Sequence, residues 1–210
     1  MKFDESFWDE RYRQHGSVWS RNPNPHLLAE AAELRPGSAL DVGSGEGADS
    51  LWLARQGWRV TAVDISSVAL ARAAERASQD ADAAARITWV HHDLTSSPPP
   101  SGTFDLVSAQ FMHLPLAERT ELYHRLAASV APGGTLLVVG HHPSDLEVGI
   151  RRPSEPGLLF TPEEIAAGLD ADEWEIDVCE ARRRSVTDAE GGSVTVTDSV
   201  LRAHRRAPRP

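Results

Sequence analysis

A glycine-rich loop after an apolar strand, residues 41–47, is the feature that most restricts the fold of this chain. Its sequence is Asp41-Val-Gly-Ser-Gly-Glu-Gly47, and it follows an apolar run that begins at Ser38. Glycine lacks a Cβ, so three glycines at alternate positions allow a tight turn and let a ligand approach the backbone closely. Free amides at the start of the following helix would point at a negative or electron-rich group. We therefore expect a strand–loop–helix unit that holds a ligand at its turn.

The rest of the chain alternates between strand-like and helix-like segments. The predicted strands are residues 38–43, 58–64, 87–90, 104–109, 135–139, 174–184 and 193–203, and the predicted helices are residues 48–56, 67–79 and 116–130. Continuous apolar runs separated by helices indicate parallel strands with both faces covered. A chain of 210 residues can bury a sizeable core in one domain. We predict one α/β domain over residues 1–210, with a mostly parallel seven-stranded sheet and helices on both faces.

The residues around the loop restrict the ligand that it could hold. A dinucleotide fingerprint reads G-x-G-x-x-G, whereas Gly47 comes one residue early, and no Gly-Lys-Ser/Thr follows as in a P-loop. Asp41 would repel a pyrophosphate but suits a ligand that carries an ammonium group. A second acid, Asp64, ends the second predicted strand about twenty residues after Gly43, where an acid can accept both hydroxyls of a ribose. Asp64 could instead cap the helix that begins near Ser66.

Five segments together resemble class I S-adenosylmethionine (SAM)-dependent methyltransferases. Residues 41–47 resemble motif I, and residues 60–64 resemble the acidic-loop motif. His92-Asp93-Leu94 resembles the adenine-reading segment. Residues 104–107 with Gln110-Phe111 resemble motif IV, and residues 132–138 resemble the last motif. They follow the family's order over about residues 38–140. The resemblance implies the Rossmann-like class I methyltransferase fold, SAM as the cofactor and S-adenosylhomocysteine (SAH) as the product.

The resemblance also implies which residues contact the cofactor. In the family, an acid and the next amide at the positions of Asp93 and Leu94 read the adenine, and Gln110 would lie near the methionine moiety. Residues 1–36 resemble the N-terminal cap of small-molecule methyltransferases related to the thiopurine and tellurite-resistance enzymes. In such a cap an aromatic ring can attract a sulfonium with about 0.5–2 kcal/mol, and an arginine can pair with a carboxylate. The implied cofactor contacts are Trp19, Arg21, Asp41, Gly43, Gly45, Gly47, Asp64, Ile65, Asp93, Leu94 and Gln110.

Two histidines are the candidates for a catalytic base. His113 follows the fourth predicted strand and His141 follows the fifth, and open α/β sheets bind their ligands at the carboxyl ends of the strands. Residues 140–160 are rich in His, Pro and Arg and predict a substrate loop or lid. The pairs at residues 91–92 and 141–142 suggest a metal, but adjacent residues of a strand point to opposite faces. We therefore expect no metal site.

Several functions stay open at this point. The leading hypothesis is methyl transfer to a small-molecule thiol, because a thiol with a pKa of about 8.5 needs little help from a base. The second is O- or N-methylation with a histidine as the base. A non-catalytic SAM-binding protein is a third hypothesis. An NAD-dependent oxidoreductase shares the sheet, but the early third glycine speaks against it.

Composition narrows the partners. The formal net charge is −10, whereas binding to nucleic acid depends on clustered Lys and Arg. The chain has no apolar stretch near the roughly 18 residues of a membrane span, and its N-terminus lacks the apolar region of a signal peptide. The single cysteine, Cys179, fits a reducing compartment, and abundant Ala and Arg beside one lysine are typical of a bacterial gene. We expect a cytoplasmic protein that acts on a small molecule and binds neither nucleic acid nor membrane, with its oligomeric state open.

Overall fold

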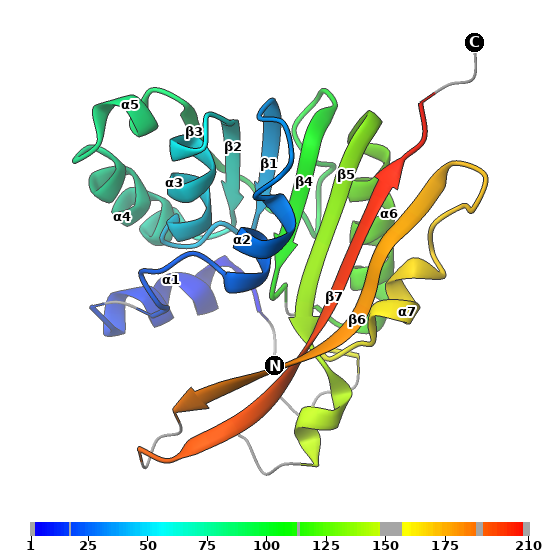
Figure 1. Cartoon of the computed structure of the whole chain (residues 1–210). Helices are drawn as coiled ribbons and strands as arrows, with labels where there is room; N and C mark the ends of the chain where they lie inside the picture. Colours follow the sequence, from blue (N-terminus) through cyan, green and yellow to red (C-terminus); the bar gives the residue numbers. More distant parts are fainter. Residues whose placement is uncertain (1–2, 17, 113, 148–156, 188–190, 208–210) are drawn as a thin grey trace.

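Seven strands form one sheet at the centre of the computed structural model (Figure 1), in the order β3-β2-β1-β4-β5-β7-β6. The structure describes residues 3–16, 18–112, 114–147, 157–187 and 191–207. The strands are β1 (Ser38–Val42), β2 (Arg59–Asp64), β3 (Ile87–His91), β4 (Phe104–Gln110), β5 (Val130–His141), β6 (Trp174–Thr187) and β7 (Ser193–Arg205). The first five pair in parallel, and β7 runs antiparallel to both β5 and β6. The predicted mostly parallel seven-stranded sheet is confirmed.

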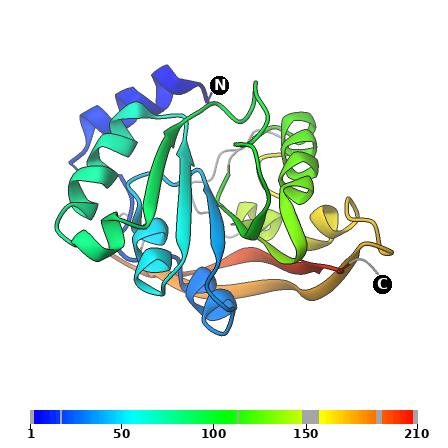
Figure 2. The same ribbon diagram turned by 90° about the horizontal axis from the view of Figure 1, so that it is seen from above.

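Helices lie on both sides of this sheet. They are α1 (Glu5–Gln14), α2 (Pro25–Ala31), α3 (Ala48–Arg55), α4 (Ser67–Ala77), α5 (Ala81–Ala84), α6 (Leu116–Ala128) and α7 (Pro162–Ala166), with a 3₁₀ turn, η1 (Pro143–Leu146). Figure 2 shows α6 on one side of the central strands and α2 and α3 on the other. No helix among the described residues is long and apolar enough to cross a membrane.

Strand β1 illustrates why both faces of the sheet are buried. Successive side chains of a strand point to opposite faces. Leu40 packs in the core that contains Leu122 of α6, whereas Ala39 packs in the core that contains Leu53 of α3. All four side chains are fully buried. The continuous apolar run therefore serves two cores, as the sequence predicted for a covered parallel strand.

Polar side chains define where the helices begin. Ser66 accepts a hydrogen bond from the backbone N–H of Ala69 (3.1 Å) and caps α4. Thr161 caps α7, and Pro162 occupies its first position. Helix α2, capped by Asn24, was not predicted, and α5 was missed as well. Both helices are short, so their apolar spacing gives a weak signal.

Three strands, β5, β6 and β7, extend further than their sequence predicts. β5 begins at Val130 and includes residues 132–134, which lie within a register shift between β4 and β5. β6 and β7 pair along their whole length, from Trp174 opposite Arg205 to Thr187 opposite Ser193. In Figure 1 the far half of this hairpin projects past the carboxyl ends of the parallel strands. The hairpin can therefore form one wall of a site at that edge.

Candidate functional site

A cavity of about 1030 Å³ lies at the carboxyl ends of the parallel strands. Its walls come from the N-terminal segment, the loop after β1, the ends of β2 and β4, the segment after β3, and the β6–β7 hairpin. Ligand sites commonly measure about 300–1,000 Å³. A cavity at the upper end of this range has room for a cofactor and a second small molecule.

The glycine loop forms one side of the cavity in the expected conformation. Gly43, Gly45 and Gly47 have φ angles of 69°, 52° and 78° and all line the cavity. These angles lie in the left-handed region that side chains disfavour. A Cβ on Gly47 would also lie 2.6 Å from the ring of Trp89 and 2.9 Å from the Cβ of Ala73. Gly47 is therefore required by both its backbone conformation and its packing against β3 and α4.

A glycine elsewhere in the chain allows these two requirements to be separated. Gly133 also has a φ of 78°, but no atom lies within 4 Å of the position of its Cβ. We expect Gly133→Ala to lower the free energy of unfolding by about 1–2 kcal/mol from the left-handed backbone alone. Gly47→Ala adds overpacking, which typically costs about 1–3 kcal/mol more. Urea unfolding of the two variants measures the difference, and equal losses would show that Gly47 is not packed as described.

Asp64 lies at the end of β2 with its carboxylate directed by two backbone amides. Its Oδ2 accepts a hydrogen bond from Gly45 N and its Oδ1 accepts one from Ser66 N, both at 2.8 Å. Burial raises the pKa of Asp64, although the two amides oppose that rise. Ser66, not Asp64, accepts from the first turn of α4. A carboxylate offers about four acceptor positions, so Asp64, which lines the cavity, can still accept ribose hydroxyls.

A pair of buried acids lies beside the loop. Asp41 is 2% exposed, accepts a hydrogen bond from the hydroxyl of Ser50, and is not among the residues that line the cavity. Asp49, in the first turn of α3, does line the cavity and accepts a hydrogen bond from Asn24 N (2.7 Å). Burial raises the pKa of Asp49 to about 6, and burial with the nearby Asp49 charge raises that of Asp41 to about 7. The structure therefore brings an unpredicted acid, Asp49, to the position expected for Asp41.

The raised pKa of Asp49 predicts how stability depends on pH. In the unfolded chain the pKa is near 3.8, so between this value and about 6 the folded chain binds more protons. Stability from this group is therefore lost as the pH rises through that window. Asp49→Asn keeps the oxygen that accepts from Asn24 and removes the charge. At pH 8 we expect the melting temperature of the variant to be a few degrees above that of the native chain, since about 1 kcal/mol shifts the melting temperature by about 2–4 °C. At pH 4 the two melting temperatures should be nearly equal. A gain of the same size at both pH values in thermal unfolding would contradict this account.

The segment after β3 brings the predicted adenine-reading residues to the cavity. Asp93 accepts hydrogen bonds from Thr95 N (2.8 Å) and Thr95 Oγ1 (2.6 Å). Burial raises the pKa of Asp93, but the bonds from Thr95 and Ser96 outweigh that effect and lower it. Leu94 is 5% exposed, and Asp93, Leu94 and Ile65 all line the cavity together with Asp64.

The N-terminal segment lies against the glycine loop. The Nε1 of Trp19 donates to the hydroxyl of Tyr12 (2.9 Å), and Trp19 lines the cavity close to Gly45. Asp9 of α1 accepts a hydrogen bond from the hydroxyl of Ser66 (2.6 Å), which fixes α1 at the start of α4. Arg21, by contrast, is exposed and is not among the residues that line the cavity.

Asn24 connects this segment to the far side of the cavity. Its Nδ2 donates to Gln110 Oε1 (2.9 Å), and Gln110 Nε2 donates to Ser108 Oγ (2.9 Å). Gln110 therefore lines the cavity at the end of β4, as predicted. Asn24 itself was not predicted as a site residue, because its contacts join segments far apart in the sequence.

The histidine expected at the end of β5 belongs to a network around a buried acid. His141 lines the cavity, and its Nδ1 lies 3.6 Å from Oδ1 of Asp198, which is fully buried. The Nε2 of His26 lies 3.0 Å from Oδ2 of Asp198, and Arg184 donates to both oxygens. Burial alone would raise the pKa of Asp198, but His141, His26 and Arg184 hold it well below its usual range. Asp198 stays ionised and orients the three groups around it.

Phe111 lies between two members of this network. Its ring centroid is 4.6 Å from that of His141, and the guanidinium of Arg184 lies 5.9 Å from it. Phe111 is the only non-glycine residue with a positive φ (53°) in the part of the chain that the structure describes. Such a backbone is strained for a bulky residue, and strain of this kind is common at functional sites.

The other predicted features of this region have different outcomes. His113 lies outside the described residues. The predicted lid at residues 140–160 begins as the end of β5 and continues into η1, and residues 148–156 lie outside the described part of the chain.

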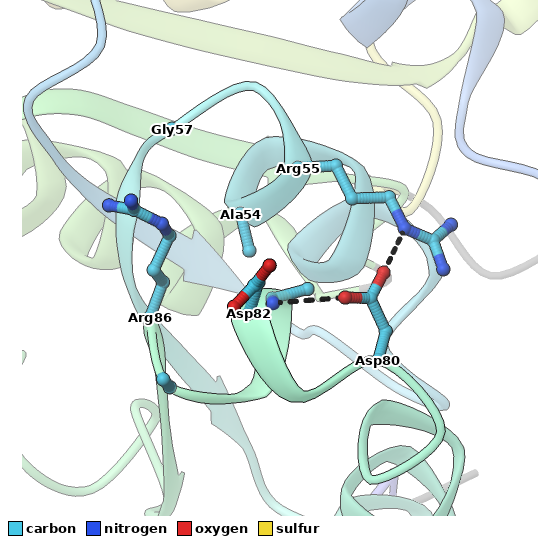
Figure 3. Close-up of a pocket in the computed structure, with 8 residues that line it drawn as sticks. Ala54, Arg55, Gly57, Asp80, Asp82 and Arg86 are labelled. Atoms are coloured by element: carbon cyan, nitrogen blue, oxygen red, sulfur yellow. Dashed lines mark hydrogen bonds and ion pairs between the residues drawn. The ribbon is translucent and has the colours of Figure 1, made fainter.

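A second hollow lies at the opposite, amino ends of β2 and β3 (Figure 3). It is lined by residues that include Arg55, Asp80, Asp82 and Arg86, and Arg55 pairs with Asp80 (2.8 Å). Its acids and bases balance one another. Open α/β sheets bind ligands at the carboxyl edge, so we assign no ligand to this hollow.

One group of potential metal ligands occurs among the described residues. It comprises Glu175, Asp177 and His204 on β6 and β7, away from the residues that line the cavity. Arg206 pairs with Glu175 (3.0 Å) and Arg202 lies 3.5 Å from Asp177. Both carboxylates therefore already have cationic partners.

Comparisons with known proteins agree with this geometry. Residues 39–134 match the family model described as a methyltransferase domain. An uncharacterized methyltransferase of Mycobacterium tuberculosis is 39% identical over 123 residues, which are 58% of this chain and 59% of that protein. The erythromycin 3''-O-methyltransferase of Saccharopolyspora erythraea is 30% identical over 154 residues, or 70% of this chain and 49% of that protein. The chain thus spans about three fifths or less of the length of these relatives.

Solved structures show the same fold. A protein described for the conversion of a disulfide bond into a thioacetal group during echinomycin biosynthesis has a TM-score of 0.74 at 21% identity, covering 98% of this chain and 93% of that one. TehB from Haemophilus influenzae has a TM-score of 0.70 at 18% identity, covering 94% and 66%. NodS from Bradyrhizobium japonicum, an N-methyltransferase, has a TM-score of 0.69 at 18% identity, covering 97% and 98%. The predicted Rossmann-like class I fold is confirmed.

Proposed function

Because residues 39–134 match a methyltransferase domain, we propose that this chain is a SAM-dependent methyltransferase that acts on a small-molecule acceptor. One observation carries the proposal. The glycine loop and Asp64, joined by the hydrogen bond from Gly45 N, line one continuous cavity with Asp93 and Leu94. In this arrangement, backbone amides of the glycine loop, a carboxylate that can accept from both ribose hydroxyls, and a segment that can read the adenine lie along one cavity, as the parts of a nucleoside require.

The charges of the cavity fit this cofactor. SAM carries a sulfonium and an ammonium group, and the lining residues on the β1–β3 side include the acids Glu46, Asp49, Asp64 and Asp93. A dinucleotide would place its pyrophosphate among these acids, which Coulomb repulsion disfavours. The open backbone of the glycine loop leaves room for a close approach of the ligand. The residues present therefore fit SAM better than NAD.

Each residue then has a defined role. Asp64 accepts the ribose hydroxyls, and Asp93 with the amide of Leu94 reads the adenine. Asp49 faces the ammonium group, while Trp19 and Gln110 border the methionine moiety. SAM supplies an electrophilic methyl group when it is bound. The surrounding side chains align the acceptor opposite the departing sulfur and exclude water, and alignment of this kind can contribute about 7–11 kcal/mol.

The acceptor atom is the finer part of the proposal. The sequence favours a thiol, which needs little help from a base. His141 beside Asp198 favours a hydroxyl, because a carboxylate 3.6 Å from Nδ1 favours the tautomer that carries its proton on Nδ1 and leaves Nε2 to accept one. The O-methyltransferase among the matched relatives supports the same choice. We therefore place a hydroxyl acceptor first and a thiol second.

Incubation with SAM tests the proposal directly. The native chain is given SAM with matched phenols, thiols and amines, and SAH formation is measured, while calorimetry measures the binding of SAH and NADH. We expect SAH to bind, NADH not to bind, and phenols to be turned over. Binding of SAH without turnover of any acceptor would indicate a non-catalytic SAM-binding protein, and binding of NADH alone would overturn the assignment of the cofactor.

A further inference from the structure

The charged residues of the cavity are segregated by sign. The acids lie at the end of β2 and in the segments that follow β1 and β3. On the side formed by β5, β6 and β7, the charged or titratable residues among the described lining are Arg184 and His141. Because the acidic side suits the cationic cofactor, the opposite side is left for the acceptor. The electrostatics of that side therefore bear on the acceptor's charge.

Arg184 is held in place and still faces the cavity. Its Nε and Nη2 donate to the two oxygens of Asp198, and its side chain is 31% exposed. A guanidinium has five N–H donors, so the pairing with Asp198 leaves donors for a further ligand. Its plane lies near the ring of Phe111, which limits its movement further. A fixed guanidinium of this kind recognises planar carboxylates with two parallel hydrogen bonds.

Few acids lie near Arg184 among the residues that the structure describes. Within the described part of the chain, Asp198 is the acid in contact with Arg184, and it also contacts His141 and His26. Glu30, the next acid on this face, is already paired with Arg182 and Arg202. Arg184 and Asp198 together are neutral, so a carboxylate meets no net negative charge here and can bind the N–H donors of Arg184 that Asp198 leaves unused.

Apart from His141 and Thr187, the lining around Arg184 is apolar. Phe111 and Met112 line the cavity after β4, and Val186 and Val196 line it from the hairpin. These side chains can pack against an aromatic or aliphatic body but cannot bond its polar groups. A ligand that fits this side has one anionic end and an apolar remainder.

We propose that the acceptor is a small carboxylic acid with an apolar or aromatic body, and that Arg184 binds its carboxylate on the β6–β7 wall of the cavity. This inference rests on the proposed function, since it concerns the acceptor of that same reaction. It makes Arg184 a residue that selects acidic acceptors over neutral ones. Asp198 acts through Arg184 as a positioning residue.

Benzoate and benzamide are suitable probes because they share a ring and differ in charge. Their dissociation constants are measured by ligand-observed NMR for the native chain, both free and saturated with SAH. We expect benzoate to bind about tenfold more tightly than benzamide, as one hydrogen-bonded charge pair provides. In Arg184→Gln the two probes should bind within about twofold of each other, and Arg184→Lys should retain part of the preference.

The neighbouring arginine supplies the matched control. Arg183 lies next to Arg184 on β6, is exposed on the other face, and does not line the cavity. Arg183→Gln should keep both the preference for benzoate and the affinity for SAH. Thermal unfolding of each variant checks that it is folded. If Arg184→Gln does not fold, Arg184→Lys still tests the proposal.

Three results would overturn the proposal. The first is equal binding of the two probes, or no binding of either, by the native chain. The second is an unchanged preference in Arg184→Gln. The third is a loss of SAH affinity in Arg184→Gln with the preference intact, which would assign Arg184 to the carboxylate of the cofactor. If the native chain did not bind SAH at all, the proposed function would be contradicted. The preference of the SAH-free chain for benzoate over benzamide would still test the role of Arg184.

Discussion

Asp64→Ala is expected to weaken SAH binding by at least about 100-fold. Two ribose hydroxyls that donate to one charged carboxylate contribute about 1.5–3 kcal/mol each. The loss is increased because Asp64 Oδ2 also accepts from Gly45 N (2.8 Å) and so holds the glycine loop in its turn. Calorimetric titration with SAH measures the effect. An unchanged affinity would contradict the role of Asp64.

The control for this variant is an acid with similar bonds at the other end of the sheet. Asp105, near the start of β4, accepts hydrogen bonds from Ser38 N (2.7 Å) and Ser38 Oγ (2.8 Å) and does not line the cavity. Asp105→Ala should lower the melting temperature but leave SAH affinity within about twofold. If both variants lost SAH affinity, the cause would be a general destabilisation of the sheet and not the loss of a specific contact between Asp64 and the ligand.

His141→Ala is expected to lower kcat for a hydroxyl acceptor by about 10²–10⁴-fold, the usual contribution of a positioned general base. The affinity for SAH should stay the same, because His141 lies on the β5 side of the cavity, away from Asp64 and Asp93. A thiol acceptor should lose much less, since a thiol ionises near neutrality without a base. Single-turnover rates with matched phenol and thiol acceptors measure both effects.

His142 provides the matched control for His141. It is the next residue along the chain, its Nδ1 lies 2.8 Å from Ser144 Oγ at the start of η1, and it does not line the cavity. His142→Ala should leave kcat unchanged with either acceptor. If His141→Ala had no effect with a phenol, the base would have to be sought elsewhere and the preference for a hydroxyl acceptor would be lost.

Local sequence patterns predict the parts of the fold that depend on local interactions. The apolar runs predict the strands because each strand is buried on both faces. The glycine loop is predictable because positive φ angles at Gly43, Gly45 and Gly47 restrict those positions to glycine. The place of Asp64 follows from its position at the end of β2, since the carboxyl ends of parallel strands meet at one edge.

The β5–β7 side of the cavity, which we propose for the acceptor, could not be predicted in this way. His26 and Asp198 are 172 residues apart and meet only because α2 lies over β7. That docking depends on Glu30, which pairs with Arg182 and Arg202 of the hairpin. No spacing rule connects such residues. The composition of β6 shows arginines, but only the tertiary structure shows that Arg184 faces the cavity and Arg183 does not.

On the side of the cavity that we propose for the cofactor, sequence position alone also failed to identify the acid that faces the cavity. Asp41 was expected near the ligand because it precedes the loop, yet β1 directs its side chain beneath the loop toward Ser50. Asp49 lies in the first helical turn, where acids are common for helix stability alone, so its sequence position gives no functional signal. Its exposure to the cavity depends on how α3 packs.

A crystal structure of the chain with SAH bound tests the central claim most directly. We expect both ribose hydroxyls within hydrogen-bond distance of the Asp64 carboxylate, the adenine beside Asp93 and Leu94, and the sulfur directed toward the side of the cavity that holds His141. A nucleoside bound elsewhere, or a glycine loop blocked by a side chain, would contradict it.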